Sequence, residues 1–171
     1  MERLKAKIRN IPDFPKPGIQ FKDITPLVKD PASLRLAVQQ LLFPFLGERL
    51  TAVVGMEARG FIFGGLVAWE LGVGFVPLRK PGKLPYEVQS ASYDLEYGSA
   101  QLEVHVDALH AQDRVLLVDD LLATGGTAAA SCELITKLGA EIAACAFVVE
   151  LDDLGGRARL APYRVHTLVH Y

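Results

Sequence analysis

The chain has 171 residues, of which 50% are hydrophobic and 22% are charged, a balance typical of one globular domain with its own core. Its formal net charge of −2 argues against nucleic acid as the main partner. The N-terminal residues lack the apolar core of a signal peptide, and no run reaches the roughly 20 apolar residues of a membrane span. We therefore expect a cytoplasmic protein without a membrane partner.

The first residues predict a short helix followed by an irregular segment. Leu4 and Ile8, within residues 2–9, have the i, i+4 spacing of one apolar helix face. Between residues 10 and 26, four prolines and Gly18 argue against a regular element, while several large apolar side chains argue against a free linker. We expect a proline-stiffened loop packed over the body of the protein, a position in which loops often cover a ligand.

The next part of the chain predicts a helix and then a strand–helix–strand unit. Asp30-Pro31 is typical of a helix start, with Asp as the N-cap and Pro at the first helical position. A β-type run at 51–54, an apolar helix at 61–71 and an apolar strand at 74–78 follow. This succession is typical of a βαβ unit and favours a parallel sheet.

Residues 79–92 interrupt this pattern because they are polar and weakly periodic, and we expect an exposed, mobile loop there. Apolar and polar residues then alternate at 101–106, which predicts a half-exposed antiparallel strand. Residues 93–95 are the expected hairpin partner of this strand.

A second strand–helix–strand unit occupies most of the remaining chain. The predicted elements are a strand at 113–120, a helix at 127–138, a strand at 142–151, a short helix at 154–160 and a last strand at 165–169. The sequence therefore predicts one α/β domain with a central, mostly parallel sheet flanked by helices.

The strand at 113–120 ends in two adjacent acids, Asp119 and Asp120, and Thr124-Gly-Gly-Thr127 then opens a helix. The unpaired N–H groups at a helix N-terminus bind phosphate, and carboxylates can bind sugar hydroxyls or a hydrated cation. Because successive strand side chains point to opposite faces, one acid should reach over the ligand and the other should lie lower. The segment lacks both the Gly-Lys-Ser/Thr of a nucleoside-triphosphate loop and a dinucleotide fingerprint. A sugar phosphate fits this combination.

Residues 115–128 resemble the 5-phosphoribosyl-1-pyrophosphate (PRPP) binding motif of type I phosphoribosyltransferases, in the variant of the members that act on adenine. Four more stretches are similar to that family in order and spacing, at 14–26, 57–61, 79–85 and 92–98. The resemblance covers essentially the whole chain. It implies the type I phosphoribosyltransferase fold, with a small N-terminal base-recognition hood at about 10–26 and an antiparallel hairpin within a mobile catalytic loop at about 79–98.

The resemblance also implies a reaction. Adenine N9 would displace pyrophosphate at C1 of PRPP and give AMP, as in purine salvage, through a transition state like a ribosyl oxocarbenium ion. Mg²⁺ is the implied cofactor, held mainly through substrate and water, with Asp119 or Asp120 as the candidate protein ligand. The implied partners are these small molecules and a second copy of the chain in a homodimer. Two alternatives stay open: a transferase acting on xanthine, hypoxanthine or guanine, and a non-catalytic PRPP-sensing regulator of the same fold.

By the same resemblance, Asp119 and Asp120 would bind the ribose 2- and 3-hydroxyls. The 5-phosphate would be held by Ala123, Thr124, Gly125, Gly126 and Thr127. The pyrophosphate would be held by Arg59, Arg79, Lys80 and Lys83, within one subunit or across the dimer. The base would be held by Gln20, Phe21, Lys22 and Leu122. Glu96 would be the catalytic residue that handles the adenine proton, with Tyr97 packing or donating a hydrogen bond beside it.

Each of these residues also has a plainer interpretation. Thr127 could be only a helix N-cap, and Arg59 only a member of a surface ion pair. The basic residues at 79–83 could be solvated loop charges, and Glu96 an exposed hairpin acid.

Overall fold

The computed structural model describes residues 1–94 and 99–171. A five-stranded parallel sheet lies at its centre, with the strand order β4-β3-β7-β8-β9. The strands are β3 (Ala52–Met56), β4 (Gly74–Leu78), β7 (Arg114–Leu122), β8 (Glu141–Glu150) and β9 (Val165–His170). The expected α/β fold with a central parallel sheet is confirmed.

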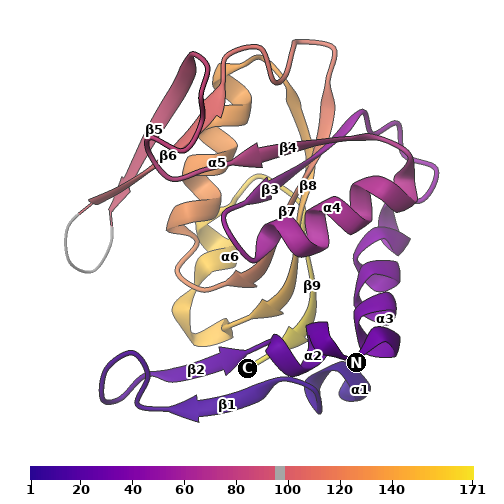
Figure 1. The fold of residues 1–171 in the computed structure, drawn as a ribbon, viewed down its shortest axis with the longest axis vertical. Helices are drawn as coiled ribbons and strands as arrows, with labels where there is room; N and C mark the ends of the chain where they lie inside the picture. The colour runs from indigo at the N-terminus through magenta and orange to yellow at the C-terminus, as the bar shows by residue number, and fades with distance from the viewer. Residues whose placement is uncertain (95–98) are drawn as a thin grey trace.

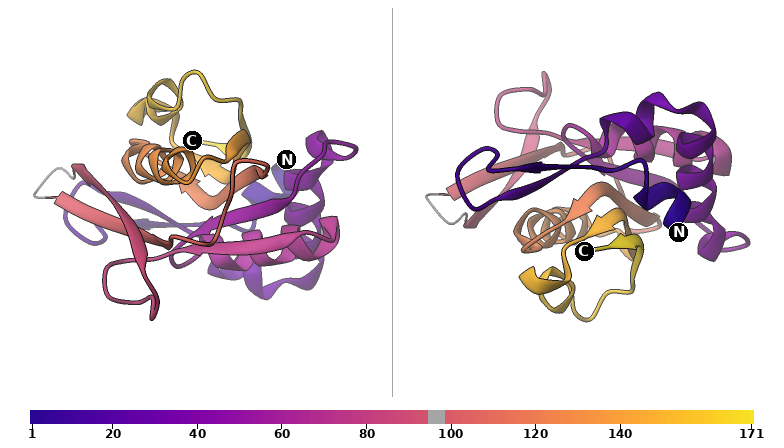
Figure 2. Two further views of the ribbon diagram at one scale, coloured as in Figure 1. Left: turned by 90° about the horizontal axis from the view of Figure 1, so that it is seen from above. Right: turned by 90° about the horizontal axis from the view of Figure 1, so that it is seen from below.

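Helices cover both faces of this sheet (Figures 1 and 2). On one face lie α3 (Pro31–Leu42) and α4 (Gly60–Leu71), and on the other lies α5 (Gly126–Lys137). Leu116 of β7 packs with the first pair, whereas its neighbour Leu117 packs with α5. Because alternate side chains of one strand enter different cores, the central strands are apolar along their whole length.

The chain leaves the two central strands in opposite directions. Strand β3 continues through α4 to β4 on one side, and β7 continues through α5 to β8 on the other. The loops that follow two such strands diverge and leave a crevice at their carboxyl ends, where α/β proteins bind ligands. Gly55 of β3 is in register with Val118 of β7, so residues 57–59 and 119–122 come together at this edge.

The start of α3 follows the predicted capping pattern. The Asp30 carboxylate accepts hydrogen bonds from the Ser33 backbone N–H (2.9 Å) and hydroxyl (2.6 Å), and Pro31 is the first helical residue. The helix ends at Leu42, where a 3₁₀ turn, η1 (Phe43–Phe45), contains Pro44. The N-cap prediction is therefore confirmed.

The N-terminal segment is more regular than expected. After α1 (Glu2–Lys5), β1 (Arg9–Pro12) pairs antiparallel with β2 (Gln20–Asp23), and α2 (Thr25–Lys29) follows. The prediction of an irregular loop over 10–26 is wrong because the prolines occupy positions that these elements tolerate. Pro12 ends a strand of a two-stranded sheet, and Pro26 lies in the first turn of a helix, where no backbone N–H is needed.

A second antiparallel hairpin joins β4 to β7. It consists of β5 (Val88–Asp94) and β6 (Ser99–His105), and it packs against α5 and projects beyond the sheet (Figure 1). The predicted hairpin is confirmed, but β5 takes up residues 88–92 of the expected loop. The polar composition there concealed a strand whose inward residue, Ala91, is buried.

Two short elements precede the last strand. They are η2 (Asp152–Leu154) and α6 (Gly156–Arg159), close to the predicted helix. None of the helices in the described ranges combines the length and apolarity that crossing a bilayer requires.

Candidate active site

A cavity of about 400 Å³ opens at the carboxyl ends of β3 and β7. Its wall consists of Met56, residues 57–59, Lys80, Tyr93 and residues 119–128. The twin acids, the Gly-rich loop and Arg59 are the residues that the family resemblance implies for PRPP binding. They border one cavity, although about 60 residues separate the two strands' ends in sequence.

The Gly-rich loop leads directly into the N-terminus of α5. Gly125 has φ +77°, the left-handed conformation that favours glycine, and α5 begins at the next residue. The first helical bond runs from Ala129 N–H to the Gly125 carbonyl, so the N–H groups of residues 126–128 have no partner within the helix. Among the described residues no side chain caps this end, and Thr127 lies inside the helix, which removes the interpretation of Thr127 as a plain N-cap. This arrangement suits an anion.

The two acids occupy different surroundings. Asp120 is buried and accepts a hydrogen bond from Arg59 Nε at 2.5 Å. Asp119 accepts the Asp120 backbone N–H at 2.8 Å and lies against the start of α4, next to Gly60. Burial, together with the negative charge of Asp120, raises the pKa of the Asp119 carboxyl well above its ordinary value. The pair thus contains one acid with a cationic partner and one acid that a cationic ligand or metal would help to ionise.

Arg59 joins this cavity to the N-terminal hairpin. Its guanidinium carbon lies 5.7 Å from the centre of the Phe21 ring on β2, and about half of its side chain is exposed. Nε bonds to Asp120, whereas within the described residues neither Nη group donates a hydrogen bond. Its partner is therefore a buried acid of the cavity rather than a surface acid, and its Nη groups are available to an anion.

The basic residues after β4 are held by Glu57. This carboxylate accepts from the Lys80 backbone N–H (2.9 Å) and from Arg79 Nε (3.2 Å), and these bonds lower the pKa of Glu57. Lys80 borders the cavity. Arg79 instead donates to Glu57 and to the Lys83 carbonyl (3.3 Å), and neither Arg79 nor Lys83 lies on the cavity wall that the described residues form. Sequence reasoning gave Glu57 no role, although its position directly after β3 was the signal.

A second cavity, of about 310 Å³, adjoins the first. Residues 19–22 of the N-terminal hairpin form one side of it, and they include Gln20, Phe21 and Lys22, the residues expected to bind the base. Tyr93, Leu121 and parts of 123–127 border both cavities, so the two share a wall.

The side chains of β2 alternate between two directions. Gln20 Oε1 accepts from Asn10 Nδ2 (2.7 Å), and Lys22 Nζ donates to Asn10 Oδ1 (3.0 Å) and lies 3.9 Å from the centre of the Tyr171 ring. Phe21 points the other way, toward Arg59. Gln20 and Lys22 are thus engaged within the protein, which leaves backbone groups of β2 and the Phe21 ring for a ligand.

Leu122 does not lie where the sequence predicts. It is buried in the core beside α5 and borders only the larger cavity, whereas Leu121 borders the smaller one. The two residues are neighbours on β7, and neighbouring strand residues point to opposite faces. Leu121, and not Leu122, therefore borders the smaller cavity together with residues 19–22.

Two predicted residues, Glu96 and Tyr97, lie outside the described residues. The nearest described side chain of β5 that borders the site is Tyr93, which lines both cavities. Sequence reasoning gave Tyr93 no role, although it belongs to the 92–98 stretch that carries the family resemblance.

The close approach of Gly60 to Asp119 yields a stability prediction. A Cβ at Gly60 would lie 2.7 Å from Asp119 Oδ1 and 3.0 Å from the Val118 carbonyl. Gly60→Ala should therefore destabilise the protein by about 1–3 kcal/mol, as overpacking does elsewhere. Denaturant unfolding measures this change.

Gly65 in the same helix is a matched control, because a methyl group added there would meet none of the described atoms within 4 Å. Gly65→Ala should stabilise the protein by about 0.5–1 kcal/mol, the usual preference of a helix for Ala. A stabilising Gly60→Ala would contradict the close approach at Asp119.

Comparison with known proteins finds relatives along the whole chain. The family model of the phosphoribosyl transferase domain matches residues 32–168. The adenine phosphoribosyltransferase of Methylococcus capsulatus is 75% identical over 171 residues, which is 100% of both chains. The crystal structure of adenine phosphoribosyltransferase from Rhodothermus marinus is 54% identical with a TM-score of 0.95, covering 99% of this chain and 97% of that one. The Saccharomyces cerevisiae enzyme, complexed with adenine and an imino-altritol bisphosphate, is 42% identical with a TM-score of 0.93, covering 98% and 97%.

Proposed function

Because this chain belongs to the phosphoribosyl transferase family, and within it to the adenine phosphoribosyltransferases, we propose that each of its two cavities binds one of the two substrates of that reaction. The enzyme is a pentosyltransferase that moves the 5-phosphoribosyl group of PRPP to adenine N9, giving AMP and pyrophosphate. The observation that supports this assignment is the wall that the two cavities share. C1 of PRPP and N9 of adenine must come into contact to react, so the two substrates must bind in adjoining spaces.

The larger cavity takes PRPP. Its 5-phosphate binds the N–H groups at the start of α5 and the hydroxyls of Thr124 and Thr127, where the helix dipole favours an anion. The ribose hydroxyls then lie over Asp119 and Asp120. As the C1–O bond breaks, positive charge develops on the ribose, and these carboxylates stabilise it.

The pyrophosphate end of PRPP binds on the opposite side of the same cavity. Arg59 offers its two Nη groups and Lys80 its ammonium, and cations of this kind stabilise the charge that the leaving group acquires. Arg79 and Lys83 join them when the segment after β4 moves toward the ligand.

The residues present fit Mg²⁺, because two carboxylates on one wall supply the oxygen ligands that this ion prefers. Asp119 is the better candidate, since Arg59 already neutralises Asp120. When bound with PRPP, Mg²⁺ offsets the negative charge of the pyrophosphate.

Adenine enters the smaller cavity under the N-terminal hairpin, which acts as the hood. Strand β2 pairs with β1 on one edge only, so unpaired backbone N–H and C=O groups on its other edge can read the Watson–Crick-type edge of the base. Phe21 and Leu121 supply apolar surface for the ring. The chain thus works as one phosphoribosyltransferase domain, with the segment around 79–98 as its catalytic loop.

Glu96 handles the adenine proton in this scheme. Glu96→Gln keeps the shape of the side chain but cannot accept a proton, and we expect kcat to fall by about 10²-fold with KM for adenine nearly unchanged. Steady-state assay of AMP formation measures both constants. Unchanged turnover would mean that another group accepts the adenine proton. The assignment of the reaction itself would still hold.

A second copy of the chain covers part of α4. Ile62, Leu66 and Trp69 lie at i, i+4 and i+7 on this helix and are exposed, Trp69 by 82%. Such a stripe of large apolar side chains on a surface helix is typical of an interface, which supports the homodimer.

Trp69→Glu should therefore convert a dimer into a monomer in sedimentation velocity at micromolar concentration. Phe43→Glu, at an aromatic residue that is exposed by 67% but lies off α4, should leave the dimer intact. A wild-type monomer, or equal effects of both changes, would rule out this interface.

Base selectivity tests the proposal as a whole. PRPP-dependent turnover should be fastest with adenine and weak with hypoxanthine, guanine and xanthine. A preference for another purine, or PRPP binding without turnover, would favour a different transferase or a PRPP-sensing regulator instead. The cytoplasmic location expected from the sequence stays a prediction.

A further inference from the structure

The Gly-rich loop at 123–126 rests directly on the backbone of a distant segment. A Cβ at Gly156 would lie 2.2 Å from the Ala123 carbonyl oxygen and 3.0 Å from Gly125 N. Reciprocally, a Cβ at Gly125 would lie 2.7 Å from the Gly156 carbonyl oxygen. Neither position has room for any side chain, so two backbones meet where the loop turns into α5.

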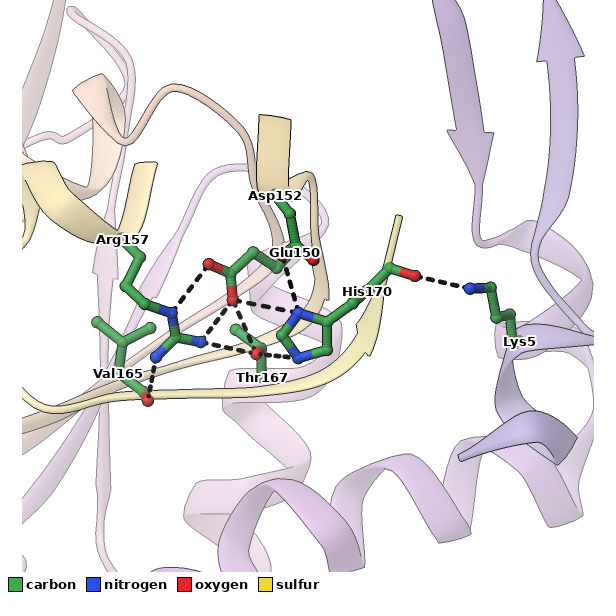
Figure 3. A network of polar contacts seen from close by, with 7 residues as sticks. All are labelled: Lys5, Glu150, Asp152, Arg157, Val165, Thr167 and His170. Carbon is green, nitrogen blue, oxygen red and sulfur yellow. Dashed lines mark hydrogen bonds and ion pairs between the residues drawn. The ribbon is translucent and has the colours of Figure 1, made fainter. Parts of the chain in front are cut away.

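The segment that carries Gly156 cannot hold this position by itself. Its helix, α6, has four residues, and a helix this short is not stable without outside contacts. Residue Arg157, next in the chain, supplies them (Figure 3). It donates from Nε and Nη2 to the two oxygens of Glu150 (3.0 and 2.5 Å), from Nη1 to the Val165 carbonyl (2.9 Å) and from Nη2 to Thr167 Oγ1 (3.0 Å).

Glu150 is the buried acceptor at the centre of this network. It ends β8, is 4% exposed and also accepts from Thr167 Oγ1 at 2.9 Å. Burial alone would raise its pKa, but the bonds from Arg157 and Thr167 outweigh it and hold the pKa of Glu150 below its ordinary value. A bidentate guanidinium–carboxylate pair of this kind fixes orientation as well as distance. The position of Gly156 is therefore tied to β8 and β9.

We propose that Gly156, held in place by the Arg157–Glu150 pair, is a positioning residue that sets the conformation of the loop at 123–126 for the 5-phosphate. This proposal rests on the proposed binding of that phosphate at the loop. Gly156 touches the loop from behind, at Ala123 and Gly125, whereas the pyrophosphate side of the cavity is built from Arg59 and Lys80. A methyl at 156 must shift the loop and leave the pyrophosphate side in place.

Two fragments of PRPP separate these effects. Ribose 5-phosphate probes the loop and pyrophosphate probes the Arg59 side, each by calorimetric titration at fixed Mg²⁺. Gly156→Ala should raise the Kd for ribose 5-phosphate by at least about tenfold and change that for pyrophosphate by less than about twofold. In turnover, KM for PRPP should rise far more than kcat falls. Unchanged binding of both, or equal weakening of both, overturns the proposal.

Gly74→Ala is the matched control, since the nearest atom to a Cβ there is the Thr51 carbonyl oxygen at 4.0 Å. It should leave both constants as they are. Because Gly156→Ala could fail to fold, Arg157→Gln provides a second route. It should weaken ribose 5-phosphate selectively by about threefold or more, and Arg157→Lys, which restores the charge, should recover part of the loss. If Arg157→Gln has no selective effect, the proposal is wrong.

Thr127→Ala distinguishes this proposal from the function on which it rests. If Thr127→Ala leaves ribose 5-phosphate binding unchanged, the Thr127 hydroxyl does not contact the phosphate and the proposed placement of PRPP fails. If Thr127→Ala weakens binding and Gly156→Ala does not, the placement of PRPP holds and the positioning role of Gly156 is refuted.

Discussion

Arg59→Gln is expected to lower kcat/KM for PRPP by about 10³-fold, because two losses combine in this variant. The Nη groups that we propose to bind the pyrophosphate are lost. In addition, Asp120, which is 3% exposed, loses the cation to which it bonds at 2.5 Å. Losing one charged partner of a hydrogen-bonded pair in a binding site costs about 2–5 kcal/mol of binding free energy, and about 4.1 kcal/mol corresponds to a factor of 10³. Initial rates over a range of PRPP concentrations measure the effect.

Arg164→Gln provides the control for the loss of an exposed arginine from an ion pair. Its side chain is exposed to a similar degree as that of Arg59, 51% against 48%, and it pairs with Glu48 at 2.9 Å outside both cavities. Its kcat/KM should stay within about twofold of the wild type. A mild effect of Arg59→Gln, similar to that of the control, would mean that the pyrophosphate binds elsewhere.

Asp119→Asn is expected to stabilise the free protein while it lowers kcat by about 10³-fold. In the proposed scheme the activity falls because an amide cannot offset the positive charge that develops on the ribose. The stability rises because burial and the charge of Asp120 raise the pKa of Asp119, so that the folded state binds a proton more tightly than the unfolded state. A carboxyl of this kind lowers the stability as pH rises from its unfolded pKa through its folded pKa.

Thermal unfolding at several pH values tests this sign. At pH 8 the Tm of Asp119→Asn should exceed that of the wild type by about 2 °C or more, and the difference should disappear in acid, where Asp119 is protonated. Asp113→Asn should do the opposite, since hydrogen bonds from Thr51 and the His110 backbone lower the pKa of Asp113. A lower Tm for Asp119→Asn at pH 8 would show that the ionised carboxylate stabilises the fold.

The features that could be predicted from the sequence are those that depend on neighbouring residues. The run from Asp119 to Thr127 defines a strand end, a turn and a helix start within one stretch, and the structure has all three there. The same holds for the N-cap at Asp30. The pairing of β1 with β2 could not be predicted in this way. The number of prolines argues against a strand, but a strand that pairs on one edge only can still contain proline, because its other edge needs no N–H donor.

The parts of the site that could not be predicted depend on distant contacts or on register. Whether Leu121 or Leu122 borders the smaller cavity depends on the pleat of β7, and a shift of one residue exchanges the two. Glu57 has a role only because β4 brings the Lys80 backbone beside it. The contact between Gly156 and Ala123 is a close approach of two backbones that are distant in sequence. The sequence of neither segment alone indicates this contact.

The shared wall of the two cavities has a thermodynamic consequence. Tyr93, Leu121 and the loop around Thr124 border both spaces, so a ligand in either one changes the surface that the other ligand meets. With PRPP and adenine placed as proposed, we expect their binding to be linked, and linkage is reciprocal: the factor by which PRPP changes the affinity for adenine equals the factor by which adenine changes the affinity for PRPP. We therefore expect cooperativity between the two substrates within a single subunit.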